Sequence, residues 1–183
     1  MTTPIKIGVS ACLLGEHVRY DGGHKHDRHI TDTLGRFFSF VPVCPEVECG
    51  LPTPREAMRL EGDPASPRLM TRQTCIDRTG QMLAFCSVKI KELGGENLCG
   101  FIFKERSPSC GLTMVPLHYG NNYKRIATGL FANEIVRCFP SMPLEEAGRL
   151  NNPCIRENFI ERVYLYRSKM SLLKNYSYIS ILT

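Results

Sequence analysis

The sequence predicts an α/β fold in which helices flank a largely parallel sheet. Two observations carry this prediction: short runs rich in β-branched and aromatic residues alternate with amphipathic segments of helical period, and several of these runs end in tight turns. Strands that alternate with helical segments are typical of parallel sheets, because a parallel connection must cross one face of the sheet. The expected architecture is Rossmann-like, with a helical extension at the C-terminus.

The first half of the chain is expected to supply two strands of this sheet with one helix between them. The strands are the apolar runs at residues 5–9 and 38–43, and residues 28–38 carry apolar side chains at helical spacing. Residues 50–68 contain four prolines and are expected to be mostly loop, since proline cannot donate to a strand ladder. Two short extended elements are expected in and after this loop, at residues 57–60 and 68–75.

The second half of the chain continues the alternation. The clearest helix is expected at residues 80–93, where five apolar side chains fall on one face ahead of two glycines. A buried strand is expected at residues 101–103, which are Phe-Ile-Phe. A short strand, a helix, a connector or last strand, and a basic amphipathic helix then follow, at residues 112–116, 129–138, 144–147 and 155–173.

Composition and charge indicate a soluble globular protein with one good core. Of the 183 residues, 43% are hydrophobic and 22% charged, and no apolar run reaches the length of a membrane-spanning helix. The N-terminus lacks the layout of a signal peptide, so the cytoplasm is the expected location. The net charge of +5 permits contact with nucleic acid without demanding it. Nine cysteines in a reducing compartment indicate ligands, catalysts or core residues in preference to disulfides.

Three cysteines share one position in the predicted sheet. Cys12, Cys44 and Cys110 each follow a strand, and the carboxyl ends of parallel strands lie along one edge, so their thiols can meet there. Three thiolates at one point repel one another unless a cation compensates them, and soft thiolate ligands favour an iron–sulfur cluster or zinc. The spacing alone leaves open a metal site, a redox couple of Cys44 with Cys49, or purely structural thiols.

The stretch Phe101–Gly111, FIFKERSPSCG, combines a buried strand with a tight exit. Pro108 cannot continue a strand ladder, and Gly111 permits backbone angles that are closed to other residues. A thiol, two hydroxyls and two cations are thereby expected on one turn past a strand end, where α/β proteins bind ligands. The basic, turn-rich loop at residues 19–26 is a second candidate for contact with a substrate or an anion.

Three linked motifs resemble one bacterial family. SACLLG with RYDGGHK, then CPEVECGLPTPRE, then KERSPSCG, occur in the order found in the thiouracil desulfurases, over roughly residues 5–140. The resemblance implies a Rossmann-like domain that removes sulfur from thiolated uracil with a 4Fe-4S cluster, which three cysteines hold so that one iron stays open. It implies Cys12, Cys44 and Cys110 as the cluster ligands, and Glu46 and Ser107 as the catalytic pair.

The implied chemistry suits these residue types. The open iron would take the thiocarbonyl sulfur, Glu46 would move protons, and Ser107 would donate a hydrogen bond or relay a proton. Ser109, Lys104 and Arg106 are expected to contact the substrate. The net reaction is hydrolytic, because sulfur leaves as sulfide and no external reductant is required. The substrate would be thiolated uracil as a free base, in a nucleoside or in transfer RNA.

The tail carries a second resemblance. PLEEAGRLNNPCIRENFIERVYLY is similar to the junction in longer relatives, where this domain is fused to a C-terminal helical domain and linked to transfer RNA. The expected division is a cluster-binding desulfurase domain at residues 1–142, followed at 143–183 by a connector and an amphipathic helical tail. This tail is expected to be the truncated start of the second domain.

Two other functions stay open at the level of sequence. A sulfur carrier or regulator that binds a cluster or zinc would hold metal without turnover. A nucleic-acid-binding module, suggested by the charge of +5 and the basic last helix, would show salt-dependent RNA affinity that survives loss of Cys110. The three linked motifs favour the desulfurase.

Overall fold

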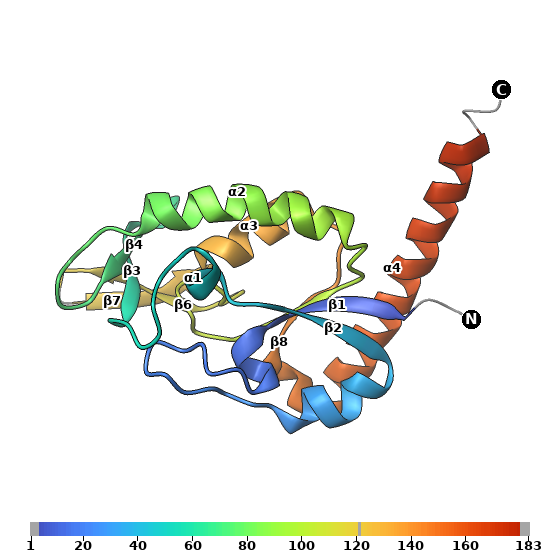
Figure 1. The fold of residues 1–183 in the computed structure, drawn as a ribbon, viewed down its shortest axis with the longest axis horizontal. Helices are drawn as coiled ribbons and strands as arrows, with labels where there is room; N and C mark the ends of the chain where they lie inside the picture. The colour runs from blue at the N-terminus through green and yellow to red at the C-terminus, as the bar shows by residue number, and fades with distance from the viewer. Residues whose placement is uncertain (1–3, 121, 180–183) are drawn as a thin grey trace.

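The fold contains a parallel sheet, sheet A, that was expected from the sequence. A computed structural model describes residues 4–120 and 122–179 (Figure 1). Sheet A has four strands in the order β2-β1-β5-β8, and each neighbouring pair is parallel. Its strands are β1 (Ile5–Ser10), β2 (Phe38–Val43), β5 (Phe101–Phe103) and β8 (Leu144–Glu146). The α/β prediction is confirmed.

A second sheet, sheet B, is mixed. Its order is β4-β3-β6-β7, in which two antiparallel pairs are joined by a parallel pairing of β3 with β6. Its strands are β3 (Met58–Asp63), β4 (Ser66–Thr71), β6 (Val115–Tyr119) and β7 (Asn122–Ala127).

The helices lie on both faces of sheet A. They are α1 (Pro45–Glu48), α2 (Thr79–Gly95), α3 (Leu130–Cys138) and α4 (Pro153–Ile179). Figure 1 shows α2 and α3 together above the sheets, with α4 on the other side of sheet A and its end projecting away from the body. Within the described residues, no helix has both the length and the apolar character needed to cross a membrane.

Sheet A separates two core clusters. Phe101 and Phe103 point to the α2–α3 side, where their rings stack at 4.4 Å and the Phe131 ring lies 5.7 Å from Phe101. Ile102 points to the other side, as strand alternation requires, and packs in a cluster with Phe159 of α4. A Cβ at Gly8 would lie 2.2 Å from the Phe101 ring, so only glycine lets this ring cross β1.

The helix expected at residues 28–38 is shorter than expected and is not a regular α-helix. A turn of π-helix (His29–Thr33) and a turn of 3-10 helix (Leu34–Arg36) take its place. Ile30 and Leu34 are buried as expected, but Phe37 is 45% exposed. Two buried anchors are enough to dock so short a segment, and Gly35 within it weakens helix propensity.

Residues 50–68 contain less loop than expected, because β3 and β4 pair along the second half of this range. The short extended elements expected at 57–60 and 68–75 overlap these two strands. Pro64 lies in the connection between them, and Pro67 lies on β4, an edge strand where a missing N–H is tolerated. The strand expected at 112–116 begins at Val115 instead. Strand β7 was missed because its first five residues are all exposed and show no alternation.

The C-terminal helix α4 packs on the second cluster through Phe159 and Val163, which are fully buried. Farther along the helix, Leu165 is 70% exposed. The division of the chain at residues 142 and 143 stays a prediction. Strand β8, which follows that point, pairs with β5 in sheet A.

Candidate active site

A cavity of about 360 Å³ lies at the carboxyl end of sheet A. The exits of β1, β2 and β5 line it, and another wall comes from Met58 of β3 and from Arg72, which directly follows β4. All eight residues that the sequence analysis assigned to the site line this cavity; they are Cys12, Cys44, Glu46, Lys104, Arg106, Ser107, Ser109 and Cys110.

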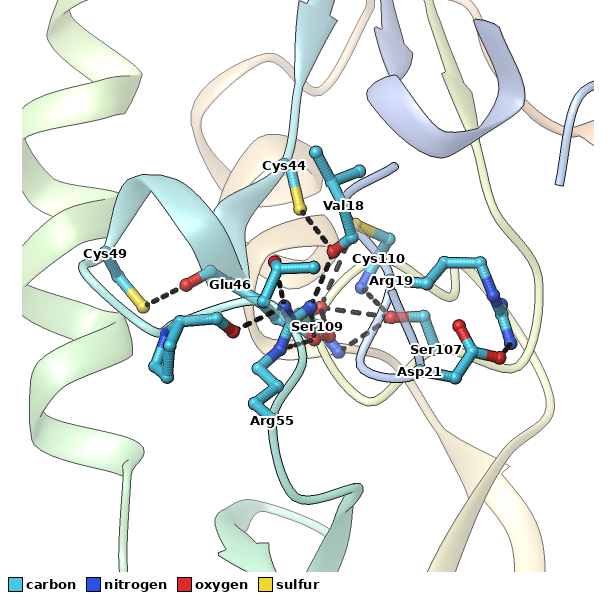
Figure 2. Close-up of polar contacts among 12 residues, drawn as sticks. Val18, Arg19, Asp21, Cys44, Glu46, Cys49, Arg55, Ser107, Ser109 and Cys110 are labelled. Atoms are coloured by element: carbon cyan, nitrogen blue, oxygen red, sulfur yellow. Dashed lines mark hydrogen bonds and ion pairs between the residues drawn. The ribbon is translucent and has the colours of Figure 1, made fainter. Parts of the chain in front are cut away.

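Cys12 and Cys44 follow neighbouring strands. Cys12 lies in a buried turn of 3-10 helix (Ala11–Leu14) directly after β1. Cys44 precedes α1, and its N–H donates to the Glu48 carboxylate at 2.7 Å. Glu48 also pairs with Lys89 of α2 at 2.8 Å, so this strand exit is tied to a long helix. The Cys44 thiol lies 3.8 Å from the Val18 carbonyl (Figure 2).

Cys110 lies in a tight turn that is stabilised by hydrogen bonds between the backbone and the Ser107 side chain. The Ser107 hydroxyl accepts hydrogen bonds from the backbone N–H groups of Ser109 at 3.3 Å and of Cys110 at 3.1 Å. Gly129, at the start of α3, packs directly on this turn. A Cβ there would lie 2.5 Å from the Ser109 carbonyl carbon, so glycine is required for the close approach.

The three thiols influence one another's ionisation. The pKa of Cys12 is raised to about 11, chiefly by burial and then by the nearby Cys44, while Lys104 acts in the opposite direction. Burial likewise raises the pKa of Cys44 and of Cys110, and Cys110 also faces the charges of Glu46, Cys44 and Cys12. Three thiolates at this place therefore need a compensating cation.

The donor set suits a cluster better than a single ion. Across the parts of the chain that the structure describes, no three His, Cys, Asp or Glu side chains converge as one metal ion requires. A single zinc ion needs its sulfur ligands about 2.3 Å from one centre. An iron–sulfur cluster binds each cysteine to a different iron, so its thiolate ligands need not meet at one point. Three soft donors around a cavity fit such a cluster.

Cys44 and Cys49 do not face each other. The Cys49 thiol lies 3.1 Å from the backbone carbonyl of Glu46, whereas the Cys44 thiol points toward Val18 (Figure 2). The redox couple left open by the spacing has no support in this arrangement. Cys86 and Cys99, two further thiols, are buried in the first and second core clusters, respectively.

The Glu46 carboxylate lies between a cation and a hydroxyl (Figure 2). Its Oε2 accepts from Arg55 Nη2 at 2.5 Å and from Arg55 Nε at 3.0 Å. Its Oε1 accepts from the Ser109 hydroxyl at 2.7 Å, and the Ser107 hydroxyl lies 3.0 Å from that of Ser109. Ser109 is thus the direct partner of Glu46, and Ser107 lies one hydrogen bond farther away.

Lys104 and Arg106 bring positive charge to the same cavity. The Lys104 ammonium pairs with Glu105 at 2.7 Å, and its backbone N–H donates to the Ser10 hydroxyl at 3.0 Å. Arg106 is exposed and has a left-handed φ of 59°. Arg19 and Lys25, from the basic loop that the sequence singled out, also line the cavity.

Arg55 and the wall beside sheet B were not predicted from the sequence. Arg55 lies in the proline-rich segment after α1, and its side chain is only 5% exposed. A cation placed nine residues after a candidate catalytic carboxylate is a weak signal in a sequence. Extended elements were expected around Met58 and Arg72, but nothing in the sequence indicated that these elements border the cavity.

Comparisons with known proteins agree with this geometry. The sequence profile of the 2-thiouracil desulfurase family matches residues 7–147, a range that includes all eight candidate residues. A search of curated proteins finds no significant match. A solved structure of TudS (DUF523Vcz), a [4Fe-4S]-dependent thiouracil desulfidase, matches with a TM-score of 0.64 and 26% identity, over 84% of this chain and 98% of that chain. The family match spans more than half of the chain and confirms the resemblance of the three motifs, so this protein belongs to the 2-thiouracil desulfurase family.

Proposed function

We propose that this protein is an enzyme that hydrolytically removes sulfur from thiolated uracil with a 4Fe-4S cluster held by Cys12, Cys44 and Cys110. One observation carries the proposal: thiols from three strand exits and the Glu46 carboxylate line a single cavity. Membership of the family and the likeness to TudS support the same reaction.

The three cysteines would bind the cluster as thiolates. When bound, a cluster with three cysteine ligands supplies a Lewis-acidic iron for a thiocarbonyl sulfur. Since burial holds the pKa values of these thiols high, cluster binding must release protons. The positive charges of Lys104 and Arg55 favour the thiolate forms of Cys12 and Cys44, respectively.

Glu46 would act as the general base. Its Oε1 would accept a proton from the water that attacks the ring carbon, and would return it to the departing sulfur. The oxygen of water replaces sulfur on the ring carbon. Sulfur leaves as hydrogen sulfide, which carries the two protons of that water. No electrons are gained or lost, so the reaction needs no reductant.

The two serines would serve Glu46 in different ways. Ser109 donates to Oε1 directly and would hold or pass the proton there. Ser107 supports Ser109 at 3.0 Å and would relay a proton through it, while it also fixes the turn that carries Cys110. Lys104 and Arg106 would orient the polar edge of the base.

The proposed substrates share a thiolated uracil ring. The cavity volume of about 360 Å³ lies in the range of small-molecule sites, and a free base or a nucleoside suits it. A thiolated position in transfer RNA is the larger candidate. None of the nine cysteines, which all lie among the described residues, forms a disulfide, and this suits the proposed cytoplasmic location.

The test is anaerobic reconstitution with iron and sulfide, followed by assays of sulfide and uracil formation from 2-thiouracil and 4-thiouracil. We expect stoichiometric sulfide and uracil from at least one base, and none from the metal-free protein. Turnover without metal would contradict the cluster's role. Bound iron without turnover of either base, of their nucleosides or of thiolated transfer RNA would favour a sulfur carrier or regulator.

A further inference from the structure

Arg55 is a buried cation whose role the sequence did not suggest. Its side chain is 5% exposed, and the Glu46 side chain beside it is 14% exposed. A charge at such a depth is costly unless its partners satisfy it. The following inference rests on the proposed function, because it concerns how Glu46 is held for that reaction.

Every N–H donor of the Arg55 guanidinium has a partner within the protein. Nε and Nη2 donate to Glu46 Oε2 at 3.0 and 2.5 Å, and Nη2 also donates to the Val18 carbonyl at 2.9 Å. Nη1 donates to the Pro52 carbonyl at 3.2 Å and to the Thr53 hydroxyl at 3.1 Å. A guanidinium has five N–H groups, so this arrangement leaves none for a substrate. Arg55 must therefore act through the groups it holds.

Glu46 depends on this contact for its orientation. It lies on α1, a helix of four residues, which is too short to be stable without tertiary contacts. Because Arg55 takes Oε2, the other oxygen, Oε1, is directed toward the Ser109 hydroxyl (Figure 2). Rotation of the carboxylate would break both the ion pair and the bond to Ser109.

Arg55 also connects Glu46 to the segment that contains Val18 and Tyr20. Its guanidinium and the Cys44 thiol both contact the Val18 carbonyl, and its backbone N–H donates to the Tyr20 carbonyl at 2.8 Å. Val18 and Tyr20 both line the cavity. One side chain thus fixes Glu46 relative to a loop that borders the cavity.

We propose that Arg55 is the positioning residue for Glu46, and that it presents Oε1 of the carboxylate to Ser109 and the cavity. A lysine cannot reproduce this arrangement, because its three donors radiate from one nitrogen and cannot place two hydrogen bonds on Oε2 while holding three further acceptors.

The test is a double-mutant cycle on kcat, with KM and iron content measured for each variant. We expect Arg55→Gln and Arg55→Lys to lower kcat by about 10–100-fold, a range set by misplacement of a reacting group, with KM changed less than about twofold. In the Glu46→Gln background, the same Arg55 substitutions should change kcat by less than about twofold relative to Glu46→Gln alone. Arg149→Gln is the control, since Arg149 pairs at 2.8 Å with Glu145, a carboxylate of similar burial that does not line the cavity.

Three results would overturn the proposal. An equal loss of kcat in both backgrounds would mean that Arg55 acts independently of Glu46. A rise in KM with unchanged kcat would assign Arg55 to substrate binding, and full kcat in Arg55→Lys would show that charge alone is enough. If Arg55→Gln does not fold or loses iron, Arg55→Lys carries the cycle.

Thermal unfolding of the metal-free variants separates this proposal from the proposed function. We expect Arg55→Gln to lower Tm by less in the Glu46→Gln background than in the wild type, because the ion pair is already lost. This coupling is measurable even if the wild type releases no sulfide, in which case the function fails and the pairing stands. Equal Tm losses in both backgrounds would show that Arg55 and Glu46 are not energetically coupled, which would contradict the ion pair itself.

Discussion

Sheet A and sheet B contribute to the same cavity in different ways. Sheet A is parallel, so its strand exits meet at one edge and bring together Cys12, Cys44 and Cys110 from distant parts of the chain. Sheet B pairs neighbouring segments as hairpins and supplies wall residues such as Met58 and Arg72. The parallel sheet thus brings the candidate site residues together, whereas the mixed sheet supplies part of the cavity wall.

The largest expected difference between the sheets is catalytic. We predict that Glu46→Gln, at the edge of sheet A, lowers kcat by about 10²–10⁴-fold with iron retained, because an amide cannot accept the proton. Glu61 of sheet B also pairs with an arginine at 2.5 Å, and Glu61→Gln should leave kcat within about twofold. Steady-state assays give kcat for both variants. Comparable kcat values for Glu46→Gln and Glu61→Gln would contradict this prediction.

A substitution in the core of sheet B should affect stability and spare catalysis. Leu60 is fully buried on β3, and Leu60→Ala is predicted to lower the free energy of unfolding of the metal-free protein by about 2–5 kcal/mol. Urea denaturation gives this loss, and kcat measured well below the Tm should stay near the wild-type value. A large fall in kcat with unchanged stability would place sheet B in the chemistry.

A smaller effect is expected where α3 meets the turn of Cys110. Gly129→Ala puts a Cβ 2.5 Å from the Ser109 carbonyl carbon, so backbone must shift, at a cost of about 1–3 kcal/mol. We expect a lower Tm together with less iron per chain, because the displaced turn carries a proposed ligand. Normal iron content at a normal Tm would show that the turn tolerates the added carbon.

The smallest effect is expected outside both sheets. Gly94 lies in the last turn of α2, and a Cβ there meets no atom within 4 Å. Gly94→Ala is predicted to raise the free energy of unfolding by about 0.5–1 kcal/mol, because alanine loses less backbone entropy in a helix. A chemical denaturation curve checks the sign, and a destabilised variant would contradict it.

The difference between a parallel and a mixed sheet also explains which parts of the fold and of the candidate site could be predicted from the sequence. Sheet A was predictable because strands buried on both faces, such as Phe101–Phe103, are continuous apolar runs in the sequence. The convergence of the three candidate cysteines was predictable because the carboxyl ends of parallel strands lie along one edge. Sheet B was predicted only in part: short extended elements were expected where β3, β4 and β6 lie, but their pairing was not, and β7 was missed because its residues are almost all exposed. Arg55 escaped prediction because its partners are a loop carbonyl and a carboxylate that only the folded chain brings together.

Whether the strand exits of sheet A hold a cluster is decided by iron and acid-labile sulfide per chain after anaerobic reconstitution, measured in the wild type, Cys110→Ala and Cys86→Ala. Cys86 is the matched control, because it is buried and lies outside the cavity. If the edge of sheet A holds the cluster, the wild type and Cys86→Ala should contain about four irons and four sulfides, and Cys110→Ala should lose most of both. Equal iron in all three proteins, or none in any, would contradict the account.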